Sequence, residues 1–239
     1  ESFLHGNWQQ SDALAFQKKV AEHLKNAAII EDLRRPLFEI KKVTRYELEL
    51  PCSDHAMVVY YQAQTDCVAE KVKMMALNHL INQDYFNELR TTQQLGYLVG
   101  AGYAPFNTRA GIAFYVQSPK FDAKTLLHRH NSFIKKYLDN IDALDENDWQ
   151  QQKHGLSTHI AEKDKNLRLR SQRLWLAIGN RDHEFHMQQR LLDALNALTL
   201  REVKVYALSL FDDDRPRYEL LSSAKVSKSQ NMPVYSQSL

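Results

Sequence analysis

The stretch ELRTTQQLGYLVGAGY, residues 88–103, changes its pattern in the middle. Its first half has the apolar spacing of a helix, and Gly96 predicts where that helix ends, because glycine is often found just past a helix C-terminus. An apolar strand follows at once and begins at Tyr97. Arg90 lies on one side of this abrupt corner and Tyr97 on the other, so the corner is the first place to look for a functional site.

Helices and strands alternate on both sides of the corner. The patterns before it predict a short strand, a helix with Ser11 as its N-cap, an extended run, a strand and the helix that ends at the corner: residues 2–7, 11–27, 37–50, 55–64 and 65–94. After it we expect a helical segment from about residue 146 that breaks near 179–182, and Thr199 as the cap between two later helices. The remaining strands and helices on that side are predicted at residues 97–104, 111–118, 122–141, 191–198, 199–211 and 217–224.

The order of these elements predicts an α+β fold, in which helices stack on one face of a mixed, mainly antiparallel sheet. No shift in composition marks an internal boundary, so we expect a single domain over residues 1–223 and a polar tail over residues 224–239. The chain starts at Glu1 inside a strand-like run, which indicates a piece of a longer polypeptide.

The composition is that of an average globular domain. Apolar residues make up 44% and charged residues 25% of the chain, and no run approaches the ~18 apolar residues of a membrane-spanning helix. Lys and Arg number 31 against 29 Asp and Glu, which gives no reason to expect nucleic acid or a membrane as a partner. Cys52 and Cys67 are too few for a disulfide scaffold, and they leave open either one bridge or two free thiols.

Ten histidines invite a search for a metal site. HEFH at residues 183–186 lacks the spacing of H-E-x-x-H, and HRH at residues 128–130 points its rings to different sides of a helix. KVAEH at residues 19–23 is closest to the inverted motif H-x-x-E-H, but Lys19 stands where the first histidine would be. An ammonium group cannot bind zinc, which needs three or four convergent ligands. We therefore expect no metal site in this chain.

The run KDKNLRLRSQR, residues 163–173, is basic and lies on a predicted helix. The nearly neutral total charge favours a solvated helix face. A face that binds polyanions is the alternative, and it predicts strongly salt-dependent binding.

The corner itself has a structural and a functional interpretation. In the structural one, Gly96 caps the helix, Arg90 interacts with the helix C-terminus and Tyr97 packs in the core. In the functional one, Arg90 offers a rigid fork of donors and Tyr97 offers a phenol hydroxyl to a ligand. Gly100 and Gly102 would then allow another backbone to approach the strand. The residues alone favour the structural interpretation.

A resemblance changes this balance. LRTTQQLGY, residues 89–97, resembles the L-R-T-x-E-Q-L-G-Y signature in the C-terminal half of the pitrilysin and insulin-degrading enzyme family of zinc metallopeptidases. The signature differs once, because Gln93 stands where glutamate is usual, so no role that needs a charge is carried over to that position. Further segments resemble that family in the same order along nearly the whole chain: LHGNW at 4–8, FNELR at 86–90 and FYVQS at 114–118.

The resemblance implies the place of this chain in a larger enzyme. In that family, one polypeptide carries four related α+β domains in two halves, which close around an unfolded peptide or small protein. Zinc and the H-x-x-E-H helix belong to the first domain, and this chain is similar to the final one, which has lost them. Zinc is therefore expected in the full-length enzyme, and no cofactor is expected in this chain. Its partners would be the N-terminal catalytic half of the same polypeptide and a peptide substrate, and the chain alone is expected to be inactive.

The resemblance also implies roles at the corner. Arg90 and Tyr97 match the arginine and tyrosine that reach across the closed chamber, bind the substrate backbone and help to stabilise the oxyanion. Gly96, Gly100 and Gly102 would contribute to substrate binding. Gly100 and Gly102 would do so by letting a peptide backbone lie along the strand edge.

One alternative belongs to a different class of protein. The chain would then be a non-catalytic scaffold or chamber subunit of a two-subunit processing peptidase, and the presence or absence of H-x-x-E-H in the parent polypeptide distinguishes the two. By analogy with bacterial pitrilysins we expect a periplasmic location, and otherwise a cytoplasmic one.

Overall fold

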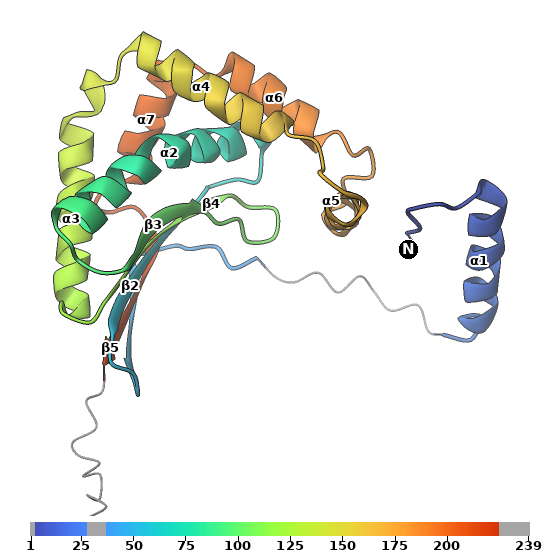
Figure 1. Cartoon of the computed structure of the whole chain (residues 1–239), viewed down its shortest axis with the longest axis horizontal. Helices are drawn as coiled ribbons and strands as arrows, with labels where there is room; N and C mark the ends of the chain where they lie inside the picture. Colours follow the sequence, from blue (N-terminus) through green and yellow to red (C-terminus); the bar gives the residue numbers. More distant parts are fainter. Residues whose placement is uncertain (1–2, 28–36, 225–239) are drawn as a thin grey trace, which may run out of the picture.

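The computed structural model describes residues 3–27 and 37–224, and within them the chain has the predicted α+β architecture (Figure 1). One sheet holds its strands in the order β1-β5-β2-β4-β3. The neighbours β1 and β5 run parallel, and the other three neighbouring pairs run antiparallel, so the mixed, mainly antiparallel sheet is confirmed. The strands are β1 (Thr44–Leu50), β2 (His55–Gln62), β3 (Leu98–Tyr103), β4 (Gly111–Ser118) and β5 (Arg217–Ala224).

Helices cover one face of this sheet (Figure 1). α2 and α3 lie against the strands, while α4, α6 and α7 pack on α2 and form a further layer. This arrangement confirms the predicted stacking of helices on one face. The helices are α1 (Gln10–His23), α2 (Val68–Phe86), α3 (Ala123–Asp139), α4 (Glu146–Ala161), α5 (Leu167–Gly179), α6 (Met187–Ala197) and α7 (Leu200–Leu210).

The core lies between the sheet and these helices. In β2, Met57, Val59 and Tyr61 alternate with less buried neighbours and face the helices. Full burial of apolar side chains of this size contributes about 1.5–3 kcal/mol each. A second cluster around Trp149 and Leu195 fixes the outer helices on α2. The matching buried residues of β4 are Ile112, Phe114 and Val116.

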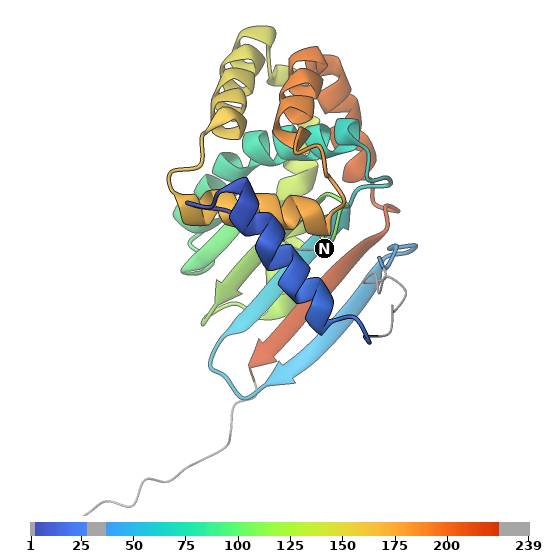
Figure 2. The same ribbon diagram turned by 90° about the vertical axis from the view of Figure 1, so that its right-hand side faces the viewer.

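α1 and α5 contribute no buried residue to either cluster. Both lie to the right of the sheet in Figure 1 and therefore in front of it in Figure 2. The strand predicted at residues 2–7 is wrong for its described part, because residues 3–7 belong to no strand. Phe3 packs instead near Trp175 of α5, with ring centroids 6.2 Å apart. The ring nitrogen Nδ1 of His5 lies 2.7 Å from the hydroxyl of Ser171. Tertiary contacts with α5 thus replace strand pairing.

The first helix begins earlier than predicted. It starts at Gln10, and Gln9 rather than Ser11 is its N-cap. The backbone N–H of Gln9 donates to the carboxylate of Asp12 at 3.2 Å. The side chain of Asp12, in the first turn of the helix, therefore accepts a hydrogen bond from the N–H of the cap residue and completes the cap.

The long helical segment from residue 146 breaks after Gly179, as predicted, but it also breaks between α4 and α5. Asn166 starts the second helix, because its side chain accepts a hydrogen bond from the N–H of Leu169 at 3.0 Å. The basic run 163–173 is therefore divided between a loop and α5, and not carried on one helix.

The C-terminal elements follow the sequence pattern. Thr199 caps α7 as predicted, and Glu202 completes a capping box with it. The predicted tail starts at Ala224, which is the last residue of β5, and residues 225–239 lie outside the described part of the chain. A single domain over residues 1–223 stays a prediction.

Candidate functional site

The corner is built on a π-helical turn. α2 ends at Phe86 and continues as Asn87–Thr92 with the wider hydrogen bonding of a π-helix. The N–H of Gln93 donates to the carbonyl of Glu88 at 2.9 Å, and the fully buried Leu89 anchors the turn. π-Helical turns are rare in proteins, and those that do occur often lie at functional sites.

The helix ends at Thr92, and Gln93 rather than Gly96 is its C-cap. Gln94, the residue just past this cap, has a φ of 52° in the left-handed region, whereas the φ of Gly96 is not positive. The prediction that Gly96 caps the helix is therefore wrong. Glycine is needed there for another reason, because a Cβ at Gly96 would lie 1.8 Å from the carbonyl oxygen of Gln117 in β4. The corner is pressed directly against β4, and this contact fixes where Tyr97 emerges.

Tyr97 is not a core residue, so the structural interpretation of it is wrong: 58% of it is exposed. Its hydroxyl donates to Oδ2 of Asp54 at 2.6 Å. The amide nitrogen Nε2 of Gln117 donates to the Tyr97 hydroxyl at 2.6 Å and to Asp54 at 3.0 Å. Ser53 donates to the other oxygen of Asp54 at 2.9 Å. Tyr97, Asp54 and Gln117 thus form a closed triangle of hydrogen bonds, which we call the Tyr97 triangle.

The hydrogen bond between Tyr97 and Asp54 shifts the pKa of both groups. It is the largest cause of the raised pKa of Tyr97. It is also the largest cause of the lowered pKa of Asp54, followed by the hydrogen bond from Ser53. At neutral pH the tyrosine is therefore an uncharged donor and the aspartate an ionised acceptor.

Arg90 lies half-buried in the π-helical turn. Its guanidinium has no hydrogen-bond or ion-pair partner among the residues that the structure describes, the carbonyls of the helix end included. It shares with Tyr97 the wall of a groove of about 720 Å³. Two sets of donors, a guanidinium fork and a phenol, therefore lie on one groove. The other lining residues are Phe86, Thr91, Gln94, Leu95, Gly96, Pro119 and Lys120.

Gln93, the residue that departs from the family signature, helps to hold the turn. Its amide Nε2 donates to Glu88 at 3.0 Å, and Glu88 pairs with Lys136 of α3 at 3.2 Å. The hydrogen bond from Gln93 is the largest cause of the lowered pKa of Glu88, and the one from Lys136 is the next. A neutral amide at this position thus serves a structural role that requires no charge.

Gly100 and Gly102 lie in β3, which ends the sheet and pairs only with β4 among the described strands. A Cβ at Gly100 would lie 2.5 Å from the hydroxyl of Tyr115, whose ring therefore already covers this glycine. A Cβ at Gly102 would meet nothing within 4 Å. Packing against Tyr115 thus explains why residue 100 is a glycine, whereas no such contact requires a glycine at position 102. The predicted roles of both in substrate binding stay predictions.

The described residues do not fit a metal site. They contain no group of three or more His, Cys, Asp and Glu side chains that could hold an ion. At the degenerate motif on α1, the ring of His23 contacts the backbone carbonyl of Lys19 at 2.8 Å. Cys52 and Cys67 are both free and exposed, which resolves the open question about a bridge. No described helix is long and apolar enough to cross a membrane.

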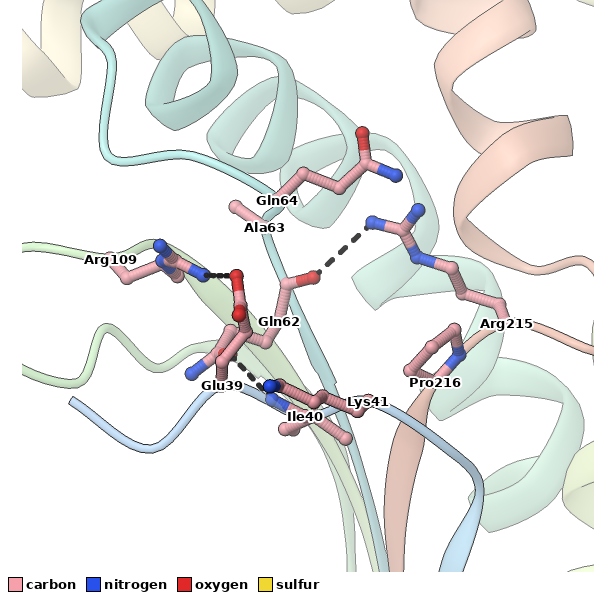
Figure 3. Close-up of a pocket in the computed structure, with 9 residues that line it drawn as sticks. All are labelled: Glu39, Ile40, Lys41, Gln62, Ala63, Gln64, Arg109, Arg215 and Pro216. Atoms are coloured by element: carbon pink, nitrogen blue, oxygen red, sulfur yellow. Dashed lines mark hydrogen bonds and ion pairs between the residues drawn. The ribbon is translucent and has the colours of Figure 1, made fainter.

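A second hollow, of about 160 Å³, is polar, and several of its lining residues contact one another (Figure 3). Arg109 pairs with Glu39 at 3.2 Å, and Arg215 donates weakly to the backbone carbonyl of Gln62 at 3.5 Å. The side chain of Gln62 accepts from the N–H of Ile40 at 3.3 Å. These contacts hold the segment before β1 against the sheet, so this hollow has a structural explanation.

The basic run is also partly neutralised. Arg173 pairs with Asp164 at 2.7 Å, and Lys165 pairs with Glu162 at 2.9 Å. The surface formed by residues 163–173 is therefore less positive than their sequence alone indicates. Binding of polyanions there stays a prediction.

Asp54 and Gln117 are the site residues that sequence reasoning missed. Gln117 belongs to FYVQS, which resembles the family, and this was its only signal. Asp54 lies 43 residues before Tyr97 in a loop, and no local pattern connects the two.

Comparisons with known proteins show what the chain is similar to. A family model described as PQQ synthase PqqF-like, C-terminal lobe domain 4, matches residues 76–175, which include the corner. Insulin-degrading enzyme from Homo sapiens is 25% identical over 235 residues, which cover 93% of this chain and 23% of that protein. The chain thus spans about a quarter of the length of this relative.

Solved structures share the fold. The crystal structure of pitrilysin matches with a TM-score of 0.80 and 17% identity, over 95% of this chain and 24% of that one. The crystal structure of a peptidase M16 inactive domain from Pseudomonas fluorescens matches with a TM-score of 0.65 and 16% identity, over 94% of this chain and 53% of that one. In both cases the chain matches one part of a longer molecule.

Proposed function

We propose that the chain, which is similar over nearly its whole length to metallopeptidases of the pitrilysin and insulin-degrading enzyme family, is the C-terminal, non-zinc domain of a metalloendopeptidase that degrades peptides in a closed chamber. In this proposal it contributes Arg90 and Tyr97 to an active site whose metal and general base come from the N-terminal half of the polypeptide. The substrate is a peptide or a small unfolded protein.

The observation that carries the proposal is the unpaired guanidinium of Arg90 on the same groove as the exposed Tyr97. Polar groups that are buried in a folded protein are nearly always paired, so the unused donors of the half-buried Arg90 are available to a ligand on the groove. A fork of guanidinium donors suits a peptide carbonyl or an oxyanion, and so does a phenol hydroxyl. Donors aimed at the charge that develops on the scissile carbonyl oxygen are typically worth about 10²–10³ in turnover each.

The chain's own residues bind and orient the peptide and take no part in holding a metal. Zinc in the N-terminal half would activate water for attack on the peptide bond. Fixing the scissile carbonyl against Arg90 and Tyr97 supplies orientation, which depends on small distances. The chain alone is therefore proposed to be inactive. Gly96, Gly100 and Gly102 are proposed to contribute to the substrate-binding surface of the corner and β3, where Gly102 leaves room for substrate backbone.

The test is peptide turnover by the full-length polypeptide with Arg90→Ala. We expect kcat/KM to fall by about 10²-fold or more, because donors to the oxyanion are lost. Arg201→Ala, which removes an exposed arginine of α7, is the matched control and should leave turnover unchanged. Turnover of Arg90→Ala within a factor of two of the wild type would contradict the proposal.

A second candidate function, a non-catalytic scaffold or chamber subunit, is favoured by one observation. The matching domain from Pseudomonas fluorescens is described as an inactive peptidase domain. The parent polypeptide decides between the two: an intact H-x-x-E-H upstream supports the enzyme, and a degraded one supports the scaffold. A periplasmic location is proposed on the analogy with bacterial pitrilysins alone.

A further inference from the structure

The Tyr97 hydroxyl has a single proton, and the fold already uses it. The hydroxyl donates this proton to Asp54 at 2.6 Å, while Gln117 donates to the hydroxyl oxygen at 2.6 Å. A substrate oxygen that approaches Tyr97 therefore finds no free proton unless the hydroxyl turns away from Asp54. The role proposed above for Tyr97 requires it as a donor, so the resting arrangement has to open during the reaction.

We propose that Asp54 is a positioning residue, which holds the Tyr97 hydroxyl until negative charge develops on the substrate oxygen, and that this oxygen then takes the hydrogen bond over from Asp54. The inference rests on the proposed function of Tyr97. The proton stays on the tyrosine throughout, and only its acceptor changes.

The difference in acceptor strength explains why the exchange waits for the transition state. Hydrogen bonds to an ionised acceptor are about twice as strong as those between neutral groups. The neutral carbonyl of a bound peptide therefore competes poorly with the carboxylate of Asp54, whereas a tetrahedral oxyanion carries a comparable charge. An interaction that forms only in the transition state lowers the barrier and does not merely tighten substrate binding.

Asp54 keeps other hydrogen bonds when it releases the Tyr97 hydroxyl. When the Tyr97 hydroxyl turns away, Asp54 keeps the donor of Gln117 at 3.0 Å and that of Ser53 at 2.9 Å. No buried carboxylate is left unpaired, because Asp54 is only partly buried. The same donors hold Asp54 in place, so the hydroxyl returns to a fixed acceptor after each turnover.

Other titratable groups near the pair have separate partners. The Nδ1 atom of His55 accepts a hydrogen bond from the N–H of Ala224 at 3.2 Å. The thiol of Cys52 donates to the backbone carbonyl of Asp54 at 3.2 Å. His55 and Cys52 influence the pair only through weaker electrostatic effects. The direct partner of the Tyr97 proton is therefore Asp54.

The first test is a double-mutant cycle in the full-length polypeptide with Asp54→Asn and Tyr97→Phe. Asparagine keeps an acceptor oxygen without its charge, so we expect kcat/KM to rise about three- to tenfold, as a neutral acceptor releases the hydroxyl more easily. In the Tyr97→Phe background the same substitution should change nothing, because the hydroxyl is gone. Asp142→Asn, which removes an exposed carboxylate elsewhere, is the charge-matched control. A fall or no change in kcat/KM with Asp54→Asn, or an equal effect in both backgrounds, would overturn the inference.

The second test needs no turnover and so separates this inference from the proposed function. 3-Fluorotyrosine is placed at position 97 of the full-length polypeptide, and its pKa is followed by ¹⁹F NMR with and without Asp54→Asn. If Asp54 holds the hydroxyl, the pKa falls toward that of free fluorotyrosine when the carboxylate is replaced. An unchanged pKa would overturn the inference even if Tyr97→Phe impairs turnover. A lowered pKa with undisturbed turnover of Tyr97→Phe would instead contradict the proposed function and, with it, the exchange of acceptors.

Discussion

Arg90 and Arg109 lie beside two different hollows of the same chain, and only one of them has a partner. Arg109 pairs with Glu39 at 3.2 Å in the small polar hollow, and only 15% of its side chain is exposed. Arg90 has no partner within the described residues and lies on the groove with Tyr97. A guanidinium that is paired inside the fold holds segments together, whereas one with unused donors is available to a ligand. The comparison therefore separates a structural arginine from a candidate binding arginine.

The largest expected effect concerns the packing that places the Arg90 groove. Gly96→Ala would put a Cβ 1.8 Å from the carbonyl oxygen of Gln117 and force the corner away from β4. We expect a loss of about 2–3 kcal/mol in the free energy of unfolding, measured in urea, because the clash is with backbone. Gly102→Ala is the matched control, since its Cβ would meet nothing within 4 Å. Equal losses for the two variants would show that the corner is not held by this contact.

His130 extends the comparison to a polar side chain that is buried in the core and does not line the groove. It is fully buried beside Tyr85, and burial, with a smaller effect of Arg217, lowers its pKa to about 3. The folded chain therefore keeps this histidine neutral at a pH where the unfolded chain protonates it. The stability that it contributes is complete above about pH 6.5 and is lost as the pH falls from there toward 3.

The measurement is chemical unfolding at pH 7 and pH 5. We expect the wild type to lose about 1–2 kcal/mol more than His130→Phe between these two values, because only the wild type must keep a buried imidazole neutral. Turnover per folded molecule should not follow this loss, since His130 lies away from the groove. The same pH dependence in both proteins would assign the loss to other groups.

Much of the fold could be predicted because its signals are local. β2 is rich in β-branched and aromatic residues and alternates in burial, and Thr199 with Glu202 forms a capping box within one turn. Arg90 and Tyr97 lie within eight residues of each other along the chain, so the sequence alone already brings both residues into one candidate site, whose role stays a prediction. Local patterns of this kind can be recognised in the sequence without knowledge of tertiary contacts.

The features that were missed depend on contacts between distant residues. Gly96 was predicted as a helix cap, but Gln94 takes the left-handed conformation and Gly96 is required by the carbonyl of Gln117. The partner of Tyr97 is Asp54, 43 residues earlier in a loop. The predicted strand at residues 2–7 failed because Phe3 packs near α5. Secondary-structure propensity depends on the residues of one segment alone, whereas contacts with distant segments determine the structure in all three cases.

The most direct test of the central claim is the affinity of the full-length polypeptide for a phosphinic peptide, whose tetrahedral charged group imitates the oxyanion. If Arg90 binds developing charge, Arg90→Ala raises the Kd by about 100-fold, because transition-state analogues report the interactions that accelerate the reaction. Arg109→Ala, whose guanidinium is already paired with Glu39, should leave the Kd within a factor of two. Equal Kd values for the two variants would contradict the assignment of Arg90 to the active site.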